Sequence, residues 1–65
     1  MRAIYIAQDA TVFEIIAAVY RQLEEKKLRD LWWGLTLGCE ESFSEVARAA
    51  HLMELVLIPT APEAL

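Results

Sequence analysis

Apolar residues recur with helical spacing over residues 11–27, the longest segment whose pattern predicts a single structure. They fall three and four residues apart, which places them on one face of a helix: Val12, Ile15, Ile16, Val19, Tyr20 and Leu23. Thr11 and Glu14 have the spacing of a capping box, in which each side chain bonds to the main chain of the other. The pattern therefore predicts a long helix over residues 11–27.

Two short segments near the ends of the chain read as strands. Residues 2–7 (R-A-I-Y-I-A) alternate Ile4 and Ile6 with Ala3, Tyr5 and Ala7, and they are rich in strand-forming side chains. Residues 53–58 (M-E-L-V-L-I) form a largely apolar run that Pro59 is expected to stop. Both segments are predicted to belong to one small sheet.

The segment after the long helix has two interpretations. With a period of two, Leu31, Trp33, Leu35 and Leu37 line one face of a strand, and a mid-helix Gly34 would cost about 1 kcal/mol. With a period of 3.6, Leu28, Leu31, Trp32 and Leu35 also form a stripe, and Gly38 suits a helix C-terminus. The pattern favours a strand over residues 31–37 and leaves the helix as the alternative.

Ser42 and Glu45 form a second capping pattern, which opens a short helix through about His51. The predicted order is therefore β-α-β-α-β, an α/β domain with a three-stranded sheet packed on the long first helix. A helical middle segment would change it to β-α-α-α-β, an α+β order. Either way, residues 1–58 are expected to form one small domain and residues 59–65 a flexible C-terminal tail.

The composition predicts that this domain pairs with another copy of itself. The chain has 65 residues, 57% of them hydrophobic, and a domain this short hides only about 60% of its unfolded surface. A homodimer would bury the surplus. On a strand, two adjacent tryptophans point to opposite faces, so one must face outward. We expect Trp32, Trp33 and Tyr5 to contribute to an interface, with Trp32 as the outward ring.

The formal net charge of −4 argues against a general nucleic-acid binder, which needs a basic surface. One basic cluster, at the predicted end of the long helix, keeps a DNA-binding regulator as the alternative function: Arg21, Lys26, Lys27 and Arg29. Residues 44–52 (S-E-V-A-R-A-A-H-L) resemble the first helix of a helix-turn-helix, and a strand before S-F-S-E-V-A-R-A resembles ribbon-helix-helix repressors. Both resemblances imply DNA contact. However, the residues after the first match are apolar, and so is the first strand, where DNA-reading side chains would have to lie.

No catalytic residue, cofactor site or metal site is predicted. Cys39 is the single cysteine, and most of a helix separates it from His51, the single histidine, so neither a disulfide nor a Cys-His dyad is expected. No uncharged run approaches the length of a membrane span. The sequence thus predicts a cytoplasmic, non-enzymatic regulatory or adaptor module. Pro59-Thr60-Ala61-Pro62 resembles the late-domain motif of viral proteins, which implies recognition by a ubiquitin-variant domain.

Overall fold

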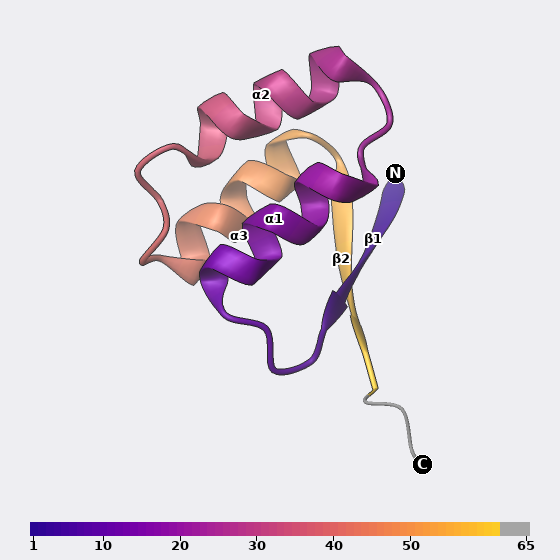
Figure 1. Cartoon of the computed structure of the whole chain (residues 1–65), viewed down its shortest axis with the longest axis vertical. Helices are drawn as coiled ribbons and strands as arrows, with labels where there is room; N and C mark the ends of the chain where they lie inside the picture. The colour runs from indigo at the N-terminus through magenta and orange to yellow at the C-terminus, as the bar shows by residue number, and fades with distance from the viewer. Residues whose placement is uncertain (62–65) are drawn as a thin grey trace.

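The chain forms three helices and two strands in a computed structural model, which describes residues 1–61. In chain order the elements are β1 (Arg2–Ala7), α1 (Val12–Gln22), α2 (Lys26–Thr36), α3 (Phe43–Leu52) and β2 (Leu55–Thr60). Figure 1 shows the two terminal strands side by side, with the helices between them in sequence. The fold is a small mixed α/β structure, and its element order is the predicted alternative.

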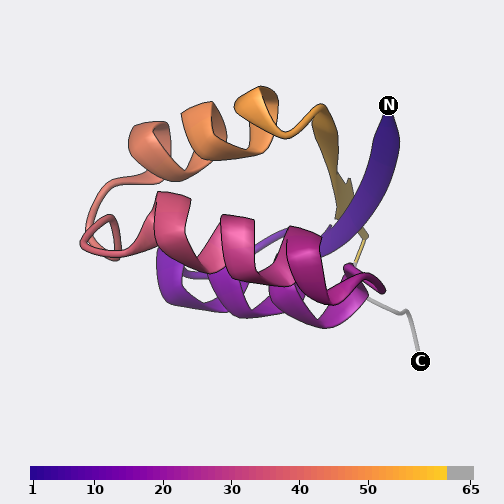
Figure 2. The same cartoon turned by 90° about the horizontal axis from the view of Figure 1, so that it is seen from above.

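The sheet has two parallel strands, so the expected three-stranded sheet is wrong for the described part of the chain. The register runs from Arg2 beside Leu55 to Ala7 beside Thr60. All three helices lie on one side of the strands, as Figure 2 shows. α1 packs on β1 and α3 packs on β2. Within residues 1–61, no helix covers the other face of the sheet.

α1 begins as predicted. The Thr11 hydroxyl accepts from the Glu14 N–H at 3.2 Å, and the Glu14 carboxylate accepts from the Thr11 N–H at 2.8 Å. The helix ends at Gln22, five residues before the predicted end, and the next helix begins at Lys26. Leu23 adopts an extended conformation and is buried, so the chain turns where its side chain enters the core.

The middle segment is a helix, and the favoured strand over residues 31–37 is wrong. α2 buries Trp32 completely and leaves Trp33 and Leu37 exposed, which is helical periodicity. Burying a tryptophan removes about 150–250 Å² from water, worth roughly 4–6 kcal/mol. The cost of a helical glycine is only about 1 kcal/mol. Gly34 also lies on the exposed side of the helix, where a Cβ would have no other atom within 4 Å.

α3 begins at the predicted cap, where the Ser42 hydroxyl accepts from the Glu45 N–H at 3.3 Å. β2 continues through Pro59 and Thr60, so these two residues are not part of a tail. In this register Ile6 lies opposite Pro59, and its main chain bonds to the residues on either side of Pro59, Ile58 and Thr60. Proline lacks an N–H, but no β1–β2 hydrogen bond is lost because that position points away from β1. Thr60 Oγ1 also donates to the Ile6 carbonyl at 3.0 Å. Residues 62–65, including the last residue of the late-domain resemblance, lie outside the described residues.

The core lies between the helices and the inner face of the sheet. Its most deeply buried large side chains come from every element except β2: Trp32, Ile4, Leu23, Val19 and Val46. Leu55 adds the β2 contribution. Among the described residues, no helix combines the length and the apolar character needed to cross a membrane.

Candidate functional site

Large apolar side chains gather on the outer surface shared by α1 and α2. We call this group the α1/α2 surface; it consists of Phe13, Tyr20, Trp33 and Leu37. The exposed fractions are 66% for Phe13, 57% for Trp33 and 67% for Leu37, whereas Tyr20 is 39% exposed. Side chains of this size are exposed together mainly where a protein meets a partner.

Helix geometry brings these residues together. Phe13 and Tyr20 are seven residues apart on α1. Trp33 of α2 and Leu37, the residue that caps its C-terminus, are four apart, so each pair lies on one side of its helix. α2 returns alongside α1 in the opposite direction (Figure 1). The Tyr20 and Trp33 rings meet edge to face, with centroids 6.1 Å apart and planes at 71°. The side chains therefore hold one another in place across the two helices.

The α1/α2 surface has one positive and one negative end. The Arg29 guanidinium lies 5.9 Å from the centroid of the Tyr20 ring, within cation–π range. Near the other end, Phe13, Trp33 and Leu37 surround a shallow hollow of about 30 Å³ that Glu40 also lines. This volume holds about one water molecule, far below the 300–1,000 Å³ typical of small-molecule sites.

The structure separates the three predicted interface aromatics. Trp32 is buried and its indole N–H donates to the Ile16 carbonyl at 3.0 Å, so the expectation that it faces outward is wrong. Trp33 is the exposed ring. Tyr5 is 56% exposed but lies on the outer face of the sheet, away from the α1/α2 surface.

The predicted basic cluster is divided by the break between the helices. Arg21 lies in the last turn of α1, whereas Lys26 and Lys27 are the first two residues of α2. The helix dipole disfavours positive charge at this N-terminus of α2. Lys26 Nζ lies 2.9 Å from Asp30, whose hydrogen bond raises the pKa of Lys26. Because Arg29 contacts Tyr20, two of the four cations already have an intramolecular partner.

The structure offers no cluster of potential metal ligands within residues 1–61. That range contains no group of three histidine, cysteine or acidic side chains that could hold a metal ion. Burial, followed by a hydrogen bond and charge from Glu45 and the charge of Glu40, raises the pKa of Cys39. The thiol is therefore protonated at neutral pH and is a poor nucleophile.

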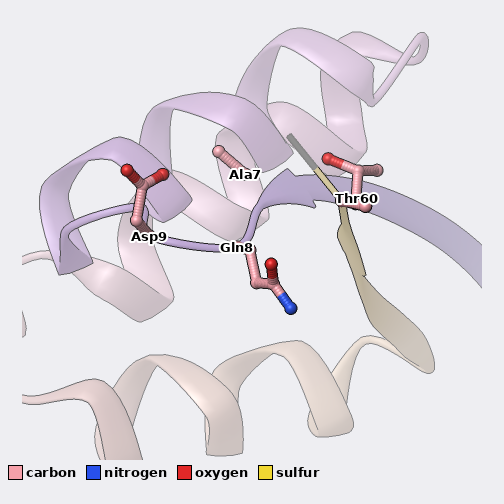
Figure 3. A pocket seen from close by; sticks show the side chains of 5 residues that line it. Ala7, Gln8, Asp9 and Thr60 are labelled. Atoms are coloured by element: carbon pink, nitrogen blue, oxygen red, sulfur yellow. The ribbon is translucent and has the colours of Figure 1, made fainter. Parts of the chain in front are cut away.

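A pocket of about 240 Å³ lies at the carboxyl ends of the strands, where ligands of parallel sheets commonly bind. Ala7, Gln8, Asp9, Thr60 and Ala61 line it. Figure 3 shows that the Gln8 and Asp9 side chains point to opposite sides of the loop. The polar groups of these two side chains therefore do not converge on one point.

The two edges of the sheet differ, which the sequence patterns did not predict. On β1, the Gln22 side-chain amide pairs with the main chain of Tyr5: its Nε2 donates to the Tyr5 carbonyl at 2.6 Å, and its Oε1 accepts from the Tyr5 N–H at 3.0 Å. Gln22 thus occupies the position that a neighbouring strand would take. No such amide lies along β2 in the described part of the chain.

Comparison of the chain with protein-family models, with curated proteins and with solved structures finds no match.

Proposed function

We propose that the protein is a small non-catalytic regulatory or adaptor module that acts through protein–protein contacts and forms a homodimer through the α1/α2 surface. The observation that carries this proposal is the exposure of four large apolar side chains on two adjacent helices. Fully burying one such side chain is worth about 1.5–3 kcal/mol. Covering this surface is therefore strongly favoured.

The distribution of charge supports a second copy as the partner. Arg29 marks one end of the α1/α2 surface and Glu40 lies near the other. In a two-fold dimer each surface meets itself, and an antiparallel arrangement brings Arg29 of one copy toward Glu40 of the other. Two helices from each copy would then form a four-helix layer, a common way to bury such faces.

Sedimentation equilibrium and size-exclusion chromatography with light scattering test the dimer. We expect association with a dissociation constant on the order of micromolar, since the surface is apolar but small. Trp33→Ala should weaken association at least tenfold because aromatic anchors dominate such interfaces. Leu31→Ala is the matched control, because Leu31 is 51% exposed on the same helix but lies outside the α1/α2 surface.

Two results would overturn the proposal. One is a monomer at concentrations of about 100 µM, well above the expected dissociation constant. The other is a dimer that Trp33→Ala and Leu31→Ala weaken equally, which would place the interface elsewhere. An added readout is tryptophan emission, which should shift to shorter wavelength on dimerisation because Trp33 leaves water.

A further inference from the structure

The outer edge of β2 presents unpaired main-chain groups. In the parallel register, the main-chain N–H and C=O groups of Val56, Ile58 and Thr60 point toward β1. The corresponding groups of Leu55 and Leu57 therefore point outward. Within residues 1–61, neither of these two N–H groups has a hydrogen-bond partner. The outward position after them is Pro59, which has no N–H, so the available donors end there.

Pro59 protects the C-terminal end of this edge, but residues 55–58 lack the charges that usually protect an exposed strand. Charged side chains or covering elements normally prevent edge strands from pairing with other chains. β2 reads L-V-L-I-P-T and contains no charge. By contrast, Gln22 covers the β1 edge at Tyr5. The middle of the β1 edge is therefore blocked at Tyr5, whereas residues 55–58 of β2 are available for an added strand.

The position of α3 decides which kind of strand can be added. α3 packs on β2, whereas paired strands lie about 4.8 Å apart and packed helices need 8–10 Å. Two copies joined antiparallel through β2 carry both α3 helices on the same face of the joined sheet, and these helices would be closer than this limit. A single extended peptide carries no covering helix, so it can lie beside β2 without this conflict.

We propose that β2 binds an extended peptide segment of another protein, which adds to the sheet as a third strand. The Leu55 and Leu57 main chains supply the hydrogen bonds. On one face, the peptide's side chains lie beside Val56 and Ile58. On the other face they lie on the side of the sheet that α3 covers, beside Leu55 and Leu57. The part of the partner segment that pairs with β2 is uncharged and consists of β-branched or other apolar residues.

This proposal names a partner class for the adaptor role in the proposed function, and it uses a different surface. Dimerisation through the α1/α2 surface and peptide binding at β2 can therefore succeed or fail separately. A Trp33→Ala variant that no longer dimerises should still bind the peptide.

The test is a titration of the isotope-labelled 65-residue chain with the peptide acetyl-Lys-Thr-Val-Ile-Val-Thr-Lys-amide, followed by NMR. We expect saturable shifts concentrated at the Leu55 and Leu57 amides, with a dissociation constant below about 1 mM, and exchange with solvent at least tenfold slower at these amides. A peptide with proline in place of its central Ile should not bind, because proline lacks the central donor.

Chemical synthesis provides the matched variants. N-methylation of Leu57 removes one outward N–H and should weaken binding at least tenfold, and N-methylation of Leu55 is the second variant if the first does not fold. N-methylation of Ala3 removes an outward N–H from the β1 edge and should leave binding unchanged. Three results would overturn the proposal: no shifts at Leu55 and Leu57, equal effects of the Leu57 and Ala3 variants, or protection of Leu57 that rises with protein concentration without peptide. The last would show a second copy at this edge.

Discussion

The Trp32 indole N–H donates to the main-chain carbonyl of Ile16 over 3.0 Å and ties α2 to the middle of α1. We predict that Trp32→Phe lowers the free energy of unfolding by about 2 kcal/mol, through a lost hydrogen bond and a smaller buried ring. Urea unfolding followed by circular dichroism measures it. Trp33→Phe is the matched control, with an expected change within about 0.5 kcal/mol. Equal losses in both variants would contradict the burial of Trp32.

The two glycines should respond oppositely to the same substitution. Gly34→Ala should raise the melting temperature by about 4 °C, because alanine favours the helix by about 1 kcal/mol and its Cβ meets nothing within 4 Å. Gly38→Ala should lower it by a similar amount, since Gly38 has φ of +86° after the end of α2. Calorimetry measures both. A gain at Gly38 would rule out this helix ending.

The capping box of α1 should make stability depend on pH. Hydrogen bonds from the Thr11 main chain and side chain hold the pKa of Glu14 below its ordinary value of 4.5. A depressed pKa means that the ionised carboxylate stabilises the folded state above the unfolded pKa, and that this contribution is lost as pH falls through the folded pKa. The side chain is exposed, so screening keeps the effect small. Glu14→Gln should flatten the stability profile between about pH 5 and 3.

The control for the capping box is Glu24→Gln, which removes a carboxylate from the connection between α1 and α2. Chemical denaturation at a series of pH values compares the two variants with the unmodified chain. If Glu24→Gln flattened the profile as much as Glu14→Gln, general charge repulsion would explain the pH dependence instead.

Cys39 should react slowly with alkylating reagents. Its thiol is partly buried and donates to the Leu35 carbonyl at 3.6 Å, and burial with nearby carboxylates raises its pKa. At pH 8 we expect iodoacetamide to modify it several-fold more slowly than a free cysteine, because the thiolate is the reactive form. Glu45→Gln should speed the reaction because Glu45 helps to raise the pKa of Cys39. Glu41→Gln should leave the rate unchanged, since Glu41 does not contribute to the raised pKa. A rate equal to that of free cysteine would exclude the raised pKa.

The ends of the helices show what local patterns can predict. The Thr11 and Ser42 caps were predicted correctly because a cap depends on residues within one turn of each other. The end of α1 was not predicted correctly, because neither glycine nor proline marks the break in the helix after Gln22. The break follows instead from the burial of Leu23 and Trp32, residues nine positions apart that must enter the same core.

The candidate site was only partly predictable for the same reason. Surplus apolar composition indicated an exposed apolar surface, but which tryptophan is exposed depended on the structure of residues 31–37. Periodicity in so short a run supports both interpretations, and packing of Trp32 against Ile16 decides between them. The pairing of Gln22 with Tyr5 joins residues 17 positions apart, a separation that no local motif reports.

That pairing has a consequence for how far any assembly built on this sheet can grow. A sheet with two open edges can add chains end over end, which is how fibrils form. Because Gln22 occupies the β1 edge at Tyr5, addition of strands to this sheet is confined to the β2 side. Loss of this one amide, as in Gln22→Ala, would therefore expose a second edge of the sheet to strand addition.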